Sequence, residues 1–176
     1  MANKHSTVER NDSHRGAAPA PAGNFSKATE LLNLCADDVF ALDDIGRRFA
    51  GNPFTPLTMA QVVSALAESI RTKLAECNKL LPGPMVHPAH IDTGEAHDVL
   101  TALDEFMVTM TNDADLRASE ATVGMVIVDM TVKAARAIAR AGLACGAPRH
   151  MVSTATYLDA DPRDPSQVHA GSIGRH

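Results

Sequence analysis

Tryptophan is absent from this 176-residue chain, and aromatic residues make up only 3% of it. Proteins that bind single-stranded nucleic acid commonly stack bases on aromatic side chains, and this sequence has too few of them to build such a platform. Basic residues are also outnumbered, because 16 Lys and Arg face 21 Asp and Glu, which gives a formal net charge of −5. Since affinity for phosphates needs clustered Lys and Arg, we expect no strong non-specific binding of nucleic acid.

Long apolar runs are missing as well. The longest uninterrupted one, near residues 125–128, is far shorter than the roughly 20 residues that cross a bilayer. No positively charged start leads into an apolar stretch of the kind that directs secretion. Only three cysteines are present, at wide spacing, and Cys35 and Cys77 fall on apolar stripes, as small buried side chains in a reducing compartment would. We therefore expect a protein of the cytoplasm with no membrane segment.

Motifs that carry chemistry are equally scarce. The sequence has no Gly-rich phosphate loop, no Gly-x-Ser-x-Gly elbow and no Glu-x-x-His repeat of the kind that builds di-metal sites in helical bundles. Cys145 has cationic neighbours in Arg149 and His150, which favour a thiolate, but its position at the C-terminal end of an expected helix disfavours one. We expect no enzymatic activity and no cofactor.

What the sequence does contain is a helical pattern. Apolar residues recur every three or four positions in four runs, which is the spacing of one stripe along a helix. The runs cover about residues 26–49, 58–81, 92–110 and 115–144. The clearest stripe positions are Leu32, Val39, Leu42, Val63, Ile70, Leu74, Leu100, Leu103, Met107, Ile127 and Ile138. Such stripes predict helices that bury one face against each other.

Breakers and caps separate the runs. Proline and glycine cluster at 51–53 and 82–84, the pair Asp92 and Glu95 has capping-box spacing, and Gly146 with Pro148 marks a helix end. The order is helix, turn, helix, linker, helix, turn, helix, which predicts an all-α four-helix bundle over residues 26–146. The two hairpins align with each other, as a duplicated hairpin would and as any two amphipathic hairpins do.

The two ends differ from the bundle in composition. Residues 1–25 mix charged and small polar residues with an Ala-Pro run, so we expect a disordered arm. Residues 147–176 are expected to be an extended or disordered tail. Within it, residues 151–158 contain Val, Thr and the only Tyr, which favours an extended conformation. This peptide either packs loosely, docks on the bundle or adds to the sheet edge of a partner.

Histidines and carboxylates crowd together only around residues 84–98. His87, His90 and His97 are weak candidates for metal ligands, with Asp92 and Glu95 between them. A zinc site needs three or four ligands that converge within about 2.0–2.2 Å of the ion, and this spacing matches no metal motif. Since Asp92 and Glu95 are expected to cap a helix, we expect no metal site.

A basic stripe on the fourth run gives the candidate partner-binding residues. Lys133, Arg136 and Arg140 are spaced to share one helix face, and Tyr157 in the tail is added to them. The alternative interpretation is ordinary solvated charge at a helix end. The fourth run is also apolar on more than one face, with Met125 outside its core stripe, which suggests a homodimer through this helix.

These observations together predict a non-enzymatic protein-interaction module: an adaptor, a small regulator or a self-associating component. Its partner would be another protein or a second copy of the chain. The alternative hypothesis is a nucleic-acid-linked transcriptional or accessory regulator that uses the basic stripe of the fourth helix. That alternative lacks a recognisable recognition helix in the sequence.

Overall fold

The computed structural model of this chain describes residues 22–49, 56–81, 87–112 and 120–160, and over these residues every regular element is helical. The predicted all-α class is thereby confirmed. The elements are α1 (Ala22–Leu34), α2 (Ala36–Phe49), α3 (Pro56–Leu80), α4 (Pro88–Asn112), α5 (Glu120–Ala144) and the 3₁₀ helices η1 (Arg149–Met151) and η2 (Ala155–Ala160). The breakers predicted at 51–53 and 82–84, and residues 1–21 and 161–176 of the two predicted ends, lie outside the described residues.

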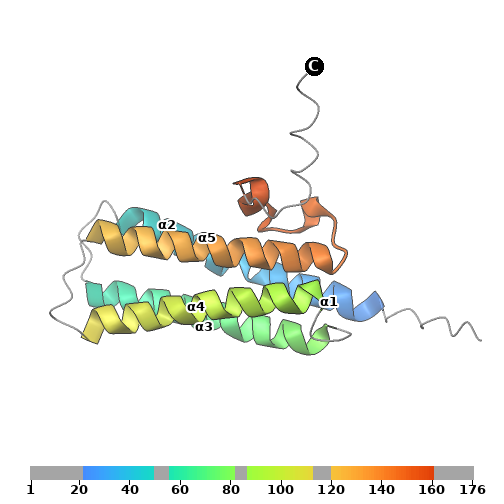
Figure 1. Ribbon diagram of the computed structural model, residues 1–176, viewed down its shortest axis with the longest axis horizontal. Coiled ribbons are helices and arrows are strands. Elements are labelled where there is room, and N and C mark those ends of the chain that lie inside the picture. The colour runs from blue at the N-terminus through green and yellow to red at the C-terminus, as the bar shows by residue number, and fades with distance from the viewer. Residues whose placement is uncertain (1–21, 50–55, 82–86, 113–119, 161–176) are drawn as a thin grey trace, which may run out of the picture.

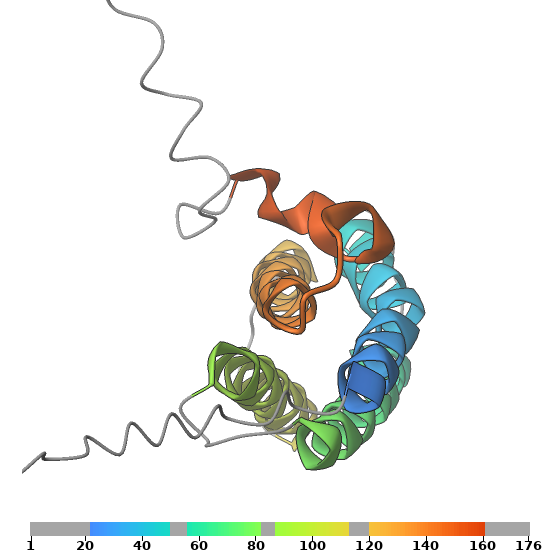
Figure 2. The ribbon, with the colours of Figure 1, turned by 90° about the vertical axis from the view of Figure 1, so that its right-hand side faces the viewer.

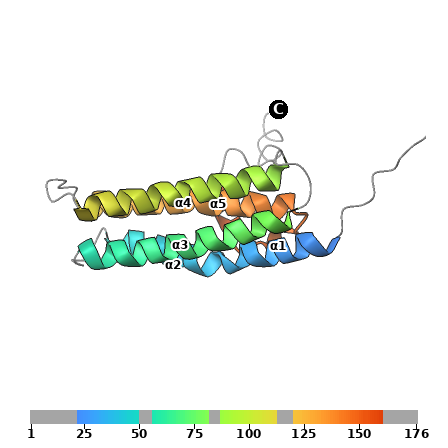
Figure 3. The same ribbon diagram turned by 90° about the horizontal axis from the view of Figure 1, so that it is seen from below.

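The helices form a bundle with four sides. Helices α1 and α2 follow each other along one side and pack against α3 and α5, while α4 packs against α3 and α5 on the opposite side (Figure 2). Successive sides run in opposite directions along the bundle (Figure 1). Helices α4 and α5 form one hairpin, which lies above the layer of α1, α2 and α3 in Figure 3. Helices with one apolar stripe each can bury all of these stripes in such an arrangement.

The core lies along the axis of the bundle and consists of the predicted stripes. The stripe residues Leu32, Val39, Leu42, Val63, Ile70, Leu74, Leu100, Leu103, Met107, Ile127 and Ile138 are all at most 2% exposed. Each large aliphatic side chain buried in this way contributes roughly 1.5–3 kcal/mol to folding relative to its exposed state. The spacing of apolar residues therefore located the core correctly.

The first predicted helix is interrupted at Cys35. The backbone N–H of Cys35 donates to the carbonyl of Leu32, three residues earlier, at 3.2 Å. Its thiol donates to the carbonyl of Leu31 at 3.4 Å. In a regular α-helix this carbonyl would accept a hydrogen bond from the Cys35 amide. Helix α2 then restarts with Asp37 and Asp38 in its first turn, where carboxylates interact favourably with the helix dipole.

The start predicted for the third run at Asp92 is wrong. Helix α4 begins at Pro88. Proline suits the first helical position because its ring fixes φ near the helical value and the missing N–H would have no partner within the helix. The ring Nδ1 of His87 accepts a hydrogen bond from the amide of Ala89 at 3.2 Å and so caps the helix. Asp92 and Glu95 lie inside the helix and serve another purpose, described below.

Helix α5 ends at Ala144, and Gly146 closes it as predicted. This glycine has a φ of 84°, its amide donates to the carbonyl of Leu143, and the amide of Ala147 donates to that of Gly142. The two bonds form the Schellman closure that a left-handed glycine permits. The chain then turns back over the outside of α5.

Candidate functional site

The segment from Arg149 to Ala160, called the tail below, lies on the outer side of the bundle beside α5 and α2 (Figure 2). Val152, Ala155 and Leu158 are buried against Ala139 of α5. Their spacing of three residues is the period of a 3₁₀ helix, so η2 presents one apolar side to the bundle. The extended conformation predicted for residues 151–158 is therefore wrong, because burial of this stripe requires helical turns.

Asn33 of α1 fixes the start of the tail. Its side-chain amide donates to the carbonyl of Met151 at 2.8 Å, and its amide oxygen accepts from the N–H of Ser153 at 3.0 Å. The amide group of one side chain therefore pairs with a backbone carbonyl and a backbone N–H of the tail, as the backbone of an adjacent β-strand would. Gly142 adds a close contact, since a Cβ there would lie 3.2 Å from the methyl groups of Val152.

Tyr157, a predicted partner-binding residue, is engaged within the chain. Its ring stacks on Phe40 of α2 with the ring centroids 5.9 Å apart, and its hydroxyl donates to Asp43 Oδ2 at 3.3 Å. Burial, followed by the charge of Asp43 and this hydrogen bond, raises the pKa of Tyr157 to about 12. Asp43 Oδ2 also accepts from Arg47 Nε at 3.0 Å. Tyr157 thus ties the tail to α2.

The predicted basic stripe does not form a single cationic surface. Lys133 pairs with Asp129, one turn before it on α5, at 2.7 Å, and both side chains are exposed. Arg136 Nε donates to the carbonyl of Tyr157 at 3.0 Å and so supports the tail. The shared helix face was predicted correctly, but part of it is covered by elements distant in sequence.

Arg140, the third residue of the stripe, lies between α4 and α5. Its guanidinium contacts Asp92 at 2.8 Å and Glu95 at 3.0 Å, and the Arg140 side chain is only 12% exposed. The two carboxylates predicted to cap a helix are therefore the partners of this cation. Arg140 holds two helices together within the chain.

The three histidines proposed as weak metal candidates are dispersed. His87 caps α4, His97 lies 3.8 Å from Asp98, and His90 is buried with its Nδ1 3.2 Å from Asn78 Oδ1. Within the described ranges, no group of three His, Cys, Asp or Glu side chains is placed to hold a metal ion. The structure does not bring these residues together.

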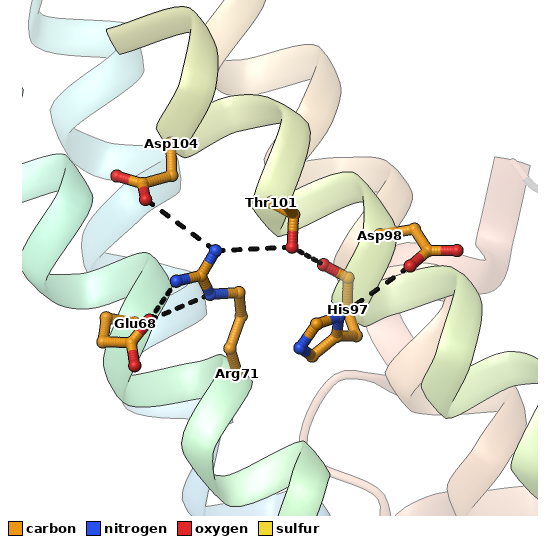
Figure 4. A network of polar contacts seen from close by, with 6 residues as sticks. All are labelled: Glu68, Arg71, His97, Asp98, Thr101 and Asp104. Carbon is orange, nitrogen blue, oxygen red and sulfur yellow. Dashed lines mark hydrogen bonds and ion pairs between the residues drawn. The ribbon is translucent and has the colours of Figure 1, made fainter. Parts of the chain in front are cut away.

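A polar network between α3 and α4 was missed by the sequence analysis (Figure 4). Arg71 of α3 contacts Glu68 on its own helix, and reaches Thr101 at 3.3 Å and Asp104 at 3.8 Å on α4. Thr101 in turn donates to the carbonyl of His97 at 2.9 Å. The signal in the sequence was a lone Arg beside a core stripe, which does not reveal its partners on another helix. The network links two helices at a partly exposed position.

An open groove of about 760 Å³ lies between α1 and the chain that follows α5, and we call it the α1–tail groove. Its lining is mainly apolar and comes from both ends of the described chain. Leu34 and Met151 stand at its rim and are 53% and 58% exposed. The lining residues are Phe25, Ser26, Thr29, Glu30, Asn33, Leu34, Cys145, Gly146, Ala147, Pro148 and Met151. Glu30 is the only one that carries a full charge.

A second hollow, of about 530 Å³, lies between α2 and α5. Helices α2 and α5 come close together at Gly46, where an added Cβ would lie 2.8 Å from a methyl carbon of Val128. Its lining residues are Gly46, Arg47, Gly124, Met125, Val128, Asp129, Val132 and Arg136. Asp129 lies at this exposed flank and pairs with Lys133.

The cysteines are suited to packing. Burial raises the pKa of the Cys35 and Cys77 thiols to about 12, and that of the half-buried Cys145 thiol to about 11. Thiols with such values are protonated near neutral pH, which disfavours nucleophilic chemistry. The groove lining contains no imidazole that could act as a base for Cys145.

Comparison of the chain with models of protein families, with curated proteins and with solved structures returned no match. None of the helices in the described ranges combines the length and the apolar character that are needed to cross a membrane. The two hollows are the concave surfaces of the described chain that could hold a partner.

Proposed function

We propose that this chain is a non-enzymatic protein-interaction module of the cytoplasm, acting as an adaptor, a small regulator or a self-associating component. We place its main docking site in the α1–tail groove. The observation that carries this proposal is the pair of exposed apolar side chains, Leu34 and Met151, on the two sides of an open apolar hollow. Exposed apolar patches around a concave surface are typical of protein contacts.

The construction of the groove supports the same function. Asn33 fixes the backbone of Met151 and Ser153, so the wall formed by the tail is held in place before a partner arrives. A preformed site loses less conformational entropy on binding than one that must be ordered. With Glu30 as the only charged lining residue, the groove fits an apolar side chain or an apolar helix face of a partner, with a cation near Glu30.

The basic stripe gives the nucleic-acid alternative no support. Lys133, Arg136 and Arg140 each contact an acceptor of the same chain, and Arg140 is largely buried. A phosphate footprint needs clustered cations that can release counterions on binding. These three side chains do not form such a cluster.

The test is co-purification of a tagged full-length chain from its own cells, followed by binding measurements with the purified partner. We expect Leu34→Gln to weaken binding at least about tenfold, because an apolar anchor is lost. Ile91→Gln is the matched control, since Ile91 on α4 is equally exposed, at 57%, and lines neither hollow. Equal affinities of the two variants for the partner, or the absence of any stoichiometric partner, would contradict the proposal.

A further inference from the structure

The tail has a small core of its own. Val152, Ala155 and Leu158 pack with Ala139 of α5, and this cluster shares no buried member with the main core of the bundle. The large aliphatic side chains that docking buries are thus only Val152 and Leu158, while the backbone from Arg149 to Ala160 must be ordered. This balance is typical of segments that open while the rest of a domain stays folded.

Contacts inside the tail join its two ends. Arg149 near the start donates to Asp159 near the end at 2.6 Å and to the carbonyl of Ala155 at 3.4 Å. The amides of Val152, Ala155 and Tyr157 each donate to a carbonyl three residues earlier, within the tail itself. Because the start and the end are connected in this way, we expect the tail to move as one unit and not to fray from its end.

The connection between α5 and the tail allows such a movement. Residues 145–148 lie between the end of α5 and the start of η1 and belong to neither helix. Within this connection Gly146 has a φ of 84°, and nothing lies within 4 Å of the position that a Cβ would take there. Glycine changes between positive and negative φ at little cost, so the chain can turn here while α5 stays intact.

The contacts that hold the tail on the bundle include two buried polar atoms without a partner. Asn33 holds the start of the tail, and Arg136 and Asp43 hold Tyr157. Among the described residues, however, the hydroxyl of Thr154 finds no hydrogen-bond partner although the residue is 1% exposed, and neither does Oδ1 of Asp43. A buried polar atom without a partner raises the free energy of the docked state. The closed tail is therefore held less firmly than its apolar contacts alone would hold it.

We propose that the tail is a strap, which opens as one unit about residues 145–148 while the bundle stays folded, and whose closing builds the α1–tail groove. Met151 stands at one rim of that groove, and Asn33 bonds its carbonyl in the closed tail. Opening therefore removes one wall, and the fraction of closed molecules sets the apparent affinity for a partner. This inference rests on the proposed function, because it regulates the proposed docking site, but the opening itself needs no partner.

Hydrogen exchange of the intact full-length chain, followed by NMR at single residues, tests the opening. We expect the amides of Val152, Ser153 and Tyr157 to share one protection factor, at least about 100-fold below those of Leu74 and Leu100 in the core. Protection that falls steadily from Val152 to Tyr157 would show fraying and overturn the inference. Protection equal to that of the core would also overturn it, because the tail would then open only when the bundle unfolds.

Two substitutions at opposite ends of the tail test whether it moves as one. Asn33→Ala loses both hydrogen bonds to the start of the tail and should lower the protection of Tyr157 and of Val152 equally, about tenfold. Leu158→Ala should likewise lower the protection of Val152 at least about tenfold. Asn112→Ala is the matched control, because Asn112 is exposed on α4 and borders α3. Changes confined to the neighbours of each substituted residue would overturn the inference.

The partner of the α1–tail groove tests the link between closing and binding. Its binding should raise the protection of the Tyr157 amide at least about tenfold, although Tyr157 does not line the groove. Binding that leaves this protection unchanged would overturn the inference. If no partner binds but the tail opens as one unit, the proposed function fails and the strap stands. If Leu34→Gln abolishes binding but the tail amides exchange only with the core, the proposed function stands and the strap is wrong.

Discussion

Arg140 and Asp92 lie 48 residues apart in sequence and 2.8 Å apart in space, and their side chains are 12% and 15% exposed. Glu95 adds a second carboxylate to the same guanidinium at 3.0 Å. A cation held by two carboxylates in a poorly hydrated position between α4 and α5 defines how these helices sit against each other.

Removing this cation should therefore destabilise the bundle strongly. We expect Arg140→Met to lower the free energy of unfolding by about 3 kcal/mol, because Asp92 and Glu95, which are 15% and 31% exposed, would lose the cation between them. Urea denaturation followed by circular dichroism measures this change. Arg48→Met is the control, because the Arg48–Asp44 pair is exposed and should be worth less than about 1 kcal/mol. Similar losses in the two variants would show that the Arg140 contacts do not stabilise the fold.

Two glycines in helices should respond in opposite directions to substitution by alanine. At Gly46 the new Cβ would meet Val128 at 2.8 Å, so we expect Gly46→Ala to lower stability by about 1–2 kcal/mol despite its better helix propensity. At Gly94 nothing lies within 4 Å, and Gly94→Ala should raise stability by about 0.5–1 kcal/mol. Thermal unfolding of both variants tests the pair. Stabilisation by both would mean that α2 and α5 can separate there at little cost.

Tyr157 is the only tyrosine, so its ionisation can be followed directly by the absorbance of tyrosinate. We expect a midpoint near pH 12 in the folded chain rather than the ordinary 10. Since the folded pKa exceeds the unfolded one, the stability contributed by the neutral phenol is complete below pH 10 and is lost as the pH rises from about 10 to about 12. Asp43→Asn should lower the midpoint without returning it to 10, because burial is the larger cause. A midpoint at 10 in the unchanged chain would mean that the tail is undocked.

The thiols should react slowly and in a fixed order. At pH 8 we expect a disulfide reagent to modify Cys145 first, at a rate well below that of a free thiol, because its pKa is about 11. Cys35 and Cys77 are buried and should react only when the chain unfolds. Cys145→Ser should remove the early phase alone. Fast modification of all three thiols in the native protein would contradict the packing described.

The sequence was sufficient for the core but not for the places where a single helix is interrupted. Residues such as Leu74 and Leu100 lie on the apolar stripe of an amphipathic helix, and any helical bundle buries that stripe in its core. Their burial could therefore be predicted without knowing which helices are neighbours. The interruption at Cys35 has no signature in the sequence, since neither proline nor glycine occurs there. The thiol of Cys35 donates a hydrogen bond to the carbonyl of Leu31 at this point, which the sequence does not reveal. The start of α4 was recognisable in principle, because Pro88 is a residue suited to the first helical turn.

The candidate sites depended on contacts that periodicity cannot reveal. Lys133, Arg136 and Arg140 do share a helix face, but spacing along one helix says nothing about which neighbour covers that face. Arg140 is enclosed by α4 and Arg136 supports the tail. The tail itself carried a signal that was overlooked, since Val152, Ala155 and Leu158 recur every three residues. The two hollows arise from the juxtaposition of distant segments and had no signature in the sequence.

The hydrogen bond from the Ser153 amide to the side-chain oxygen of Asn33 joins residues that are 120 positions apart in the sequence. One wall of the α1–tail groove comes from residues 25–34, among the earliest in the described chain, and the other from residues 145–151, among the latest. During synthesis the first wall leaves the ribosome long before the second exists. A partner that recognises this groove can therefore bind only chains that have been translated past Met151. It would not bind shorter translation products, because they lack the second wall of the groove.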